Sequence, residues 1–168
     1  MKNKGFTLVE LMVVVSIISL LSVVVFANYR AGEKQFALQR SAHKLAQDIR
    51  RAQNMSMATQ EFQGAVPGGY GIYFNITTST QYILFADLNG SKTYDSSNEK
   101  VQTLEFEKRV SIIILSPGSP LNIFFFPPDP TVLISGNPAI NSASITLNFE
   151  GGSGKTIKVN KAGLIEIE

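Results

Sequence analysis

The sequence contains no cysteine, and it has a single histidine. Without cysteine the fold uses no disulfide bond and no thiol chemistry. One histidine in a cysteine-free chain also argues against a zinc site. Proline is absent between Met1 and Val66. No residue in the first third of the chain therefore forces a break in a helix.

Charge is scarce and balanced, at 17% charged residues and a net charge of +2. A near-neutral chain gives no global electrostatic case for nucleic acid. The sequence also lacks a glycine-rich phosphate loop, a nucleophile elbow and a paired-carboxylate site. We therefore expect neither an enzyme nor a cofactor, and no small-molecule substrate.

An apolar run of 22 residues extends from Phe6 to Ala27. As a helix it would be about 33 Å long, which is enough to cross a bilayer core of roughly 30 Å. Lys2 and Lys4 precede the run, and positive residues favour the cytoplasmic side. The sequence thus predicts a membrane-spanning helix, with the rest of the chain outside the cytoplasm.

Glu10 is the one ionisable residue in this run. A carboxylate in hydrocarbon costs a few kcal/mol, and such residues usually have a function. The run itself offers no cationic partner. A cut after Gly5 would create one, because Phe6 would then carry a free α-amino group, on the same subunit or on a neighbour. Pairing with that amine would offset the desolvation cost and fix the axial register of the helix.

The segment from Lys4 to Leu11, with the apolar run behind it, resembles the class III signal of type IV prepilins and type II secretion pseudopilins. The resemblance implies that a membrane prepilin peptidase cuts after Gly5 and methylates Phe6. It also implies that Glu10 pairs with the amine of an adjacent subunit. One departure is Ala27, because many pilins have a kinking proline near this position. We therefore expect less of a kink here.

The resemblance also implies the protein's location and partners. The precursor would be a single-pass protein of the bacterial inner membrane, and the mature chain would join an extracytoplasmic filament. Its partners would be other pilin or pseudopilin subunits. Removal of the leader would also remove Lys2 and Lys4, which leaves 13 basic and 13 acidic residues. The sequence does not distinguish type II secretion, a type IV pilus and a competence apparatus.

Three other interpretations of the N-terminus stay open. The run could be a secretory signal peptide cut after Ala27, although it is long for one and carries a carboxylate. It could be a plain membrane anchor of a monomeric β domain, in which case Glu10 would have no role. It could also be a buried helix of a soluble protein.

The helix pattern continues beyond Ala27. Apolar residues recur every three or four positions, at Leu38, Ala42, Leu45, Ile49, Ala52 and Met55. This stripe predicts an amphipathic helix that continues to about Thr59. The breaker-rich segment 64–69 then ends it. We expect a leader at 1–5, a core helix at 6–27, an amphipathic helix at 28–63 and a globular head at 64–168.

The head shows the alternation typical of β-strands. Candidate strands are 70–74, 81–86, 101–106, 110–115, 122–126, 144–149, 156–160 and 164–167. We predict an α+β, pilin-like fold, in which an antiparallel meander has one buried face and the amphipathic helix covers that face. The segments 70–74, 123–129, 145–147 and 159–165 resemble the GspH/FimT branch of minor pilins and pseudopilins. This resemblance favours a minor subunit.

Two weaker site hypotheses concern the head. Asp87, Asn89, Asp95 and Glu99 place oxygen atoms around a glycine, as calcium sites do, but without the full EF-hand spacing. A hairpin turn explains the same residues more simply.

Lys155, Lys158 and Lys161 follow one another near the C-terminus. Some members of the resembled branch bind DNA, so a DNA-binding or cargo-binding minor pilin is the alternative function. A charged sheet edge explains the same lysines.

Overall fold

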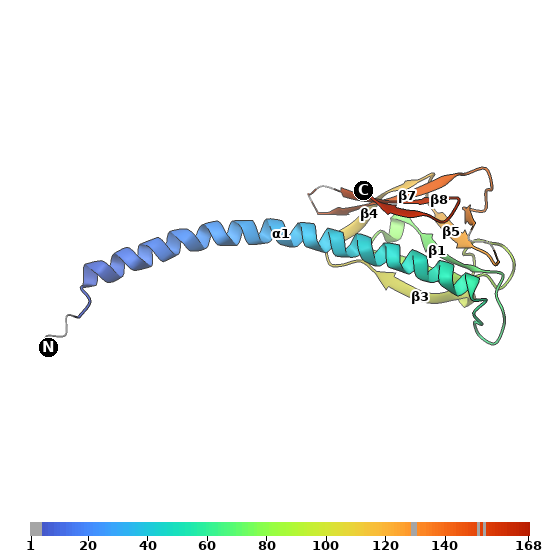
Figure 1. Ribbon diagram of the computed structural model, residues 1–168, viewed down its shortest axis with the longest axis horizontal. Coiled ribbons are helices and arrows are strands. Elements are labelled where there is room, and N and C mark those ends of the chain that lie inside the picture. Colours follow the sequence, from blue (N-terminus) through green and yellow to red (C-terminus); the bar gives the residue numbers. More distant parts are fainter. Residues whose placement is uncertain (1–4, 129–130, 151, 153) are drawn as a thin grey trace. The chain divides into compact units, whose positions relative to one another are not determined.

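The computed structural model describes residues 5–128, 131–150, 152 and 154–168, with only the backbone at residues 24–31. One long helix, α1 (Leu8–Met57), precedes nine strands (Figure 1). The strands are β1 (Tyr70–Phe74), β2 (Gln81–Ala86), β3 (Lys100–Glu105), β4 (Val110–Ser116), β5 (Leu121–Phe125), β6 (Val132–Ile134), β7 (Ser142–Phe149), β8 (Gly154–Asn160) and β9 (Ile165–Ile167). Two short 3₁₀ helices, η1 (Ile76–Thr78) and η2 (Ser97–Glu99), lie in the loops.

The chain divides into two compact units, Met1–Phe36 and Ala37–Glu168. Helix α1 passes through Ala27 without interruption and contributes to both. Its last turns, from Ala37 to Met57, cluster with the strands. We call Ala37–Glu168 the head unit. Apart from Gly5, the predicted leader lies outside the described residues.

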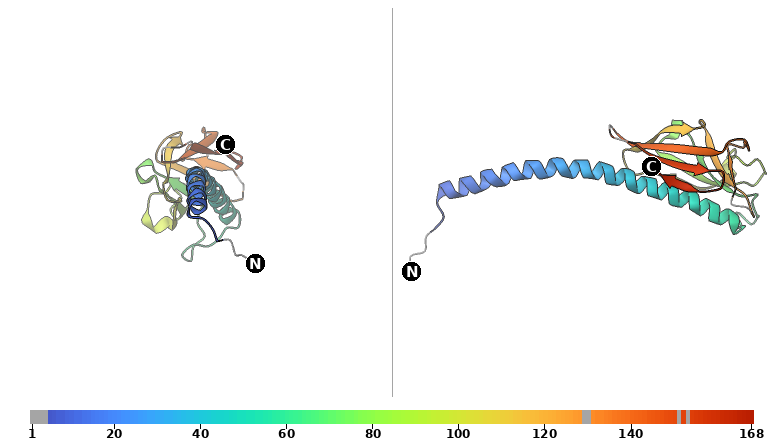
Figure 2. Two further views of the ribbon diagram at one scale, coloured as in Figure 1. Left: turned by 90° about the vertical axis from the view of Figure 1, so that its left-hand side faces the viewer. Right: turned by 45° about the horizontal axis from the view of Figure 1, so that its top comes forward.

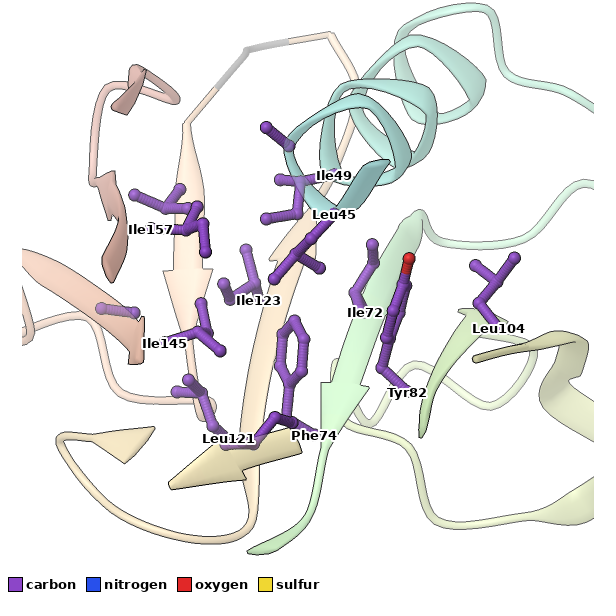
Figure 3. Close-up of a cluster of buried hydrophobic side chains, with 14 of the residues drawn as sticks. Leu45, Ile49, Ile72, Phe74, Tyr82, Leu104, Leu121, Ile123, Ile145 and Ile157 are labelled. Carbon is purple, nitrogen blue, oxygen red and sulfur yellow. The ribbon is translucent and has the colours of Figure 1, made fainter. Parts of the chain in front are cut away.

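In the head unit, the predicted apolar stripe of α1 faces the strands. Its buried members are Leu38, Ala42, Leu45, Ile49 and Ala52. Leu45 and Ile49 point from the helix into a cluster that includes Ile72, Ile123 and Ile145 (Figure 3). Along the same side, the buried Ser56 hydroxyl donates to the Phe125 carbonyl oxygen at 2.8 Å. The helix therefore covers the core as the periodicity predicts.

The antiparallel strands and the helix that packs on them confirm the predicted α+β fold, but the strands form two sheets, so the prediction of a single meander was wrong. The five-stranded sheet has the order β3-β2-β1-β5-β6, and the four-stranded sheet has the order β4-β7-β8-β9. Strand β5 pairs with β1, with Ile72 opposite Ile123, while its sequence neighbour β4 pairs with β7. Alternation identifies which side chains point inward, but it carries no information about which strands become neighbours. Figure 2 shows the strands of the head unit from two further sides.

The five-stranded sheet is buried on both faces at its centre, against the expectation of one buried face. Adjacent residues Leu84 and Phe85 point to opposite faces, and both are fully buried. Phe85 stacks with Phe124 at 6.1 Å between ring centroids, and a Cβ on Gly71 would lie only 2.6 Å from the Phe85 ring and 2.8 Å from the Ile123 carbonyl oxygen. The loop between β2 and η2 covers this second face, since Tyr94 packs on Phe85. Only glycine fits between these aromatic rings.

Strand β6 is the one strand that the sequence did not predict. It has only three residues and lies between a proline-containing segment and the turn at Gly136. It pairs with β5, with Ile123 opposite Ile134. Such a short apolar segment has too few positions to show alternation. The predicted glycine-rich turn before β8 includes Gly151 and Ser153, which lie outside the described residues, as does Asp129 of the 123–129 segment.

Candidate assembly segment

Helix α1 begins with a capped first turn. The Thr7 hydroxyl oxygen accepts a hydrogen bond from the Glu10 backbone N–H at 3.2 Å, and the Leu11 N–H donates to the Thr7 carbonyl at 3.2 Å. Threonine followed three residues later by glutamate is the pattern of a capping box. Sequence reasoning missed this role of Thr7, although the Thr-x-x-Glu pattern was visible. The cap fixes where the apolar helix begins.

The Gly5–Phe6 peptide bond precedes the helix and lies outside its hydrogen-bonded turns. A Cβ built on Gly5 would meet no atom within 4 Å. Packing within the described residues therefore does not require glycine at position 5. Phe6 follows with 83% of its surface exposed. The two residues of the predicted cleavage site thus lie in an accessible, non-helical segment.

The first turns of α1 expose apolar side chains on every side. These are Leu8, Val9, Leu11, Met12, Val13, Val14, Val15, Ile17, Ile18, Leu20, Leu21 and Val23. They do not form a stripe, because consecutive positions are included. A helix that is apolar all round is buried in a core or in a membrane when the protein functions. We call residues 6–23 the apolar segment.

The serines of the apolar segment satisfy their own hydroxyl groups. Ser16, Ser19 and Ser22 each donate to the carbonyl oxygen four residues earlier, at 2.8 Å. Such back-bonding needs no outside partner. These polar residues are therefore compatible with an apolar environment.

Glu10 is different. Its carboxylate is exposed, and among the described residues no hydrogen-bond or ion-pair partner contacts it. It lies in the first turn of α1, where the helix dipole favours a negative charge by about 0.3–1 kcal/mol. This favourable interaction covers only part of the few kcal/mol that a carboxylate costs in an apolar environment.

The calcium candidates form a hydrogen-bonded loop. One Asp87 carboxylate oxygen accepts from the N–H groups of Gly90 and Ser91, at 2.8 and 3.1 Å, and the other accepts from Lys92 at 3.2 Å. The Asn89 amide donates to both Asp95 carboxylate oxygens, at 3.0 and 3.1 Å. The donors to both carboxylates are N–H groups of the loop itself. This pattern is the one expected of a hairpin turn, which is the simpler explanation of these residues. The described residues contain no cluster of three or more acidic or histidine side chains that could hold a metal ion.

Glu99 anchors the far end of this loop. It is only 1% exposed, and its carboxylate accepts from the Leu88 and Asp95 N–H groups, at 3.2 and 3.4 Å. Burial raises its pKa, and the nearby charges of Asp95 and Asp87 add to the effect. The pKa of Asp95 is lowered, chiefly by the hydrogen bond from Asn89. Both carboxyl groups therefore accept hydrogen bonds from the loop that covers Phe85.

The three candidate lysines do not share a face. Lys155 has the same strand parity as the buried residues Ile157 and Val159, whereas Lys158 points to the other face. Lys158 forms an ion pair with Glu168 at 2.7 Å. Lys161 follows the strand and donates to the Pro138 carbonyl at 2.8 Å. This arrangement does not bring the three charges together.

Residues 1–26 match the family model of the prokaryotic N-terminal methylation motif. The chain carries the type IV prepilin and pseudopilin signal. This pilin-type motif supports a structural pilin or pseudopilin subunit rather than an enzyme, and it indicates a membrane-anchored precursor. No curated protein and no solved structure matches the chain. Among the described residues, we find no helix that combines the length and mean hydropathy of a membrane span.

Proposed function

We propose that this pilin-type chain is a minor subunit of a type IV pilus or type II secretion pseudopilus. In this proposal the precursor spans the inner membrane once, loses its leader after Gly5, and is methylated at Phe6. The segment 6–27 then packs among the same segments of other subunits. The observation that carries the proposal is the apolar segment, which is exposed on every side and satisfies its own hydroxyl groups.

Glu10 sets the register in this assembly. It follows Phe6 by four residues in the sequence, and the α-amino group of Phe6 becomes free on cleavage. A carboxylate that lacks a cationic partner in one subunit can pair with that amine on the next, and the pair offsets the cost of burial. Any other axial position leaves both charges unpaired in an apolar environment. The interaction therefore favours one stagger between neighbouring helices.

The minor assignment follows from the resemblance of the head segments to the GspH/FimT branch, and no described feature of the head argues against it. The lysines at 155, 158 and 161 give no support to DNA capture, because they do not converge on one face. We therefore do not extend the proposal to capture of DNA or of an exported protein. Counting the chain against other subunits in purified filaments tests the minor assignment, which a dominant copy number would overturn.

Mass spectrometry of the mature N-terminus tests the main proposal. The chain should be expressed at natural levels in its bacterial host and recovered from the membrane and filament fractions. We expect an N-terminal peptide that begins at Phe6 and carries one methyl group on its amine. A Gly5→Leu variant should keep its leader and stay out of the filaments. A mature wild-type chain that begins at Asn28 would identify an ordinary secreted protein and overturn the proposal.

A further inference from the structure

The sequence contains one Asn-Gly pair, Asn89–Gly90, and it lies in the loop between β2 and η2. Asparagine is chemically labile when glycine follows it, because glycine has no side chain to keep its backbone nitrogen away from the preceding Cγ atom. Both residues are exposed, and a Cβ built on Gly90 would meet no atom within 4 Å. The loop therefore combines a reactive dipeptide with free access for water.

Deamidation of this pair needs no reagent other than water. The Gly90 nitrogen gives up its proton and forms a bond to Asn89 Cγ, while the Cγ–Nδ2 bond breaks. The side-chain amide leaves as ammonia, which includes the proton that the Gly90 nitrogen lost. Water then opens the succinimide ring, either at Cγ to give aspartate or at the backbone carbonyl carbon to give isoaspartate. Each product carries a new carboxylate.

Hydrogen bonds hold the reacting groups in the folded loop. The Gly90 N–H donates to an Asp87 carboxylate oxygen at 2.8 Å. The Asn89 amide nitrogen donates to both Asp95 carboxylate oxygens, at 3.0 and 3.1 Å, and the amide oxygen accepts from the Ser91 N–H at 2.8 Å. The bond from Ser91 polarises Cγ and by itself favours attack. The restraint on the reaction therefore comes from Asp87 and Asp95.

Asp87 is the stronger of these two restraints. It is only 1% exposed, and its carboxylate also accepts from the Ser91 and Lys92 N–H groups, at 3.1 and 3.2 Å. A carboxylate beside the Gly90 nitrogen also raises the cost of removing its proton, because the amide anion meets a like charge. Asp87 thus opposes the reaction both through its hydrogen bonds and through its charge.

We propose that Asn89 is a site of slow deamidation, and that opening of the loop held by Asp87 sets the rate. This inference does not depend on the filament function, because it uses only the chain and water. The product destabilises the loop in turn. A carboxylate at position 89 replaces the amide that now donates to Asp95, and like charges at hydrogen-bond distance repel each other. Deamidation therefore loosens the loop that covers Phe85.

Timed mass spectrometry of the detergent-solubilised chain in mildly alkaline buffer tests the rate. Peptides that contain residue 89 should gain the mass difference between water and ammonia. In guanidinium chloride, Asn89 should react faster than any other asparagine, and folding should slow it by about tenfold or more, which corresponds to roughly 1.4 kcal/mol. Asp87→Ala should raise the folded rate by about tenfold. The exposed pair Asn141–Ser142 is the internal control and should not respond, and Asn89→Gln should abolish the signal.

Three results would overturn the inference. The first is an unfolded chain in which Asn89 is not the fastest asparagine. The second is an equal rate at Asn89 in the folded and unfolded wild-type chain, or an unchanged rate in folded Asp87→Ala. The third is equal acceleration of Asn89 and Asn141 by Asp87→Ala, because the loop would then open only when the whole head unfolds.

Asn89→Asp reproduces one product and tests its consequence for the loop. We expect trypsin to cleave this variant after Lys92, an exposed residue of the same loop, about fivefold or more faster than the wild-type chain. Asn98→Asp adds the same charge in η2 and is the matched control, with cleavage close to the wild-type rate. Equal cleavage of Asn89→Asp and Asn98→Asp would show that the new carboxylate does not loosen the loop, and would overturn that part of the inference.

Discussion

The two parts of α1 use the same secondary structure for opposite purposes. In the head unit, Leu45 and Ile49 are fully buried and the opposite side of the helix is polar. In the apolar segment, Ile17 and Ile18 are both more than half exposed, and their neighbours are exposed as well. The part of α1 in the head unit therefore has a partner within its own chain, whereas the apolar segment leaves its side chains exposed among the described residues. The comparison shows that a helix can form all its backbone hydrogen bonds and still leave its apolar side chains uncovered.

Stability has different sources in these two parts. Helices in proteins gain most of their stability from packing of an apolar face, and much less from intrinsic propensity. The head unit supplies such packing at once, through the cluster in Figure 3. The apolar segment has only its cap at Thr7 and its backbone hydrogen bonds among the described contacts. In the proposed function, lipid or other subunits supply its remaining stabilisation.

We expect the largest effect from a substitution in the apolar segment that leaves the head unit unchanged. Glu10→Ala should lower filament incorporation by more than about a hundredfold, because register then loses an ion pair in an apolar environment worth several kcal/mol. Glu10→Gln should fail similarly, since it removes the charge and keeps the shape. Electron microscopy and immunoblotting of sheared filaments measure the result. Glu33→Ala, an exposed acid on the same helix, is the control. Normal filaments from Glu10→Ala would favour a plain membrane anchor.

A matched pair of isoleucine substitutions sharpens the comparison. Ile49→Ala removes a fully buried side chain and should lower the free energy of unfolding of the head by about 2–5 kcal/mol. Ile18→Ala, at 57% exposure, should leave the stability of the head unchanged. Thermal unfolding of the detergent-solubilised chain, followed by near-ultraviolet circular dichroism, measures both. Equal destabilisation would mean that the apolar segment contributes to the folding of the head.

Sequence reasoning succeeded where a repeating pattern determined the structure. The stripe from Leu38 to Ala52 correctly gave the buried side of α1, and the strand patterns gave eight of the nine described strands to within about two residues. The breaker segment 64–69 lies in the loop between α1 and β1, although α1 ends at Met57, before that segment and before the expected boundary at residue 63. In each of these segments the local period and the tertiary packing favour the same structure.

It failed where the outcome depended on long-range pairing. The division into two sheets requires β5 to join β1 across nearly fifty residues, and no local period encodes that choice. The cap at Thr7 is encoded locally, by the Thr-x-x-Glu pattern of residues 7–10, and was predictable from the sequence. The lysines at 155 and 158 could have been separated from the sequence alone. Their odd spacing places them on opposite faces of a strand.

The loop over Phe85 gives a smaller effect within the head unit. Asp87→Ala would leave three backbone N–H groups without their carboxylate and should cost roughly 2–3 kcal/mol. Asp95→Ala removes an exposed carboxylate of the same loop and should destabilise the head much less than Asp87→Ala does. Urea unfolding gives both values. A chelator should not change the melting temperature, because these oxygens already accept protein hydrogen bonds. A chelator-induced fall would instead show that the loop binds calcium.

The smallest effect concerns the ion pair that joins α1 to the loop before β4. The Arg40 guanidinium donates to both Glu107 oxygens, at 2.6 and 2.7 Å, and lowers the pKa of that carboxyl below its ordinary value. The folded state therefore holds fewer protons than the unfolded state, and the pair stabilises the head above the ordinary pKa of glutamate. That contribution disappears as pH falls through the lowered value. Because both side chains are solvated, Glu107→Gln should cost only about 0.5 kcal/mol at pH 7 and nothing near pH 2. A difference between the two chains that persists at pH 2 would show that packing, and not charge, holds this contact together.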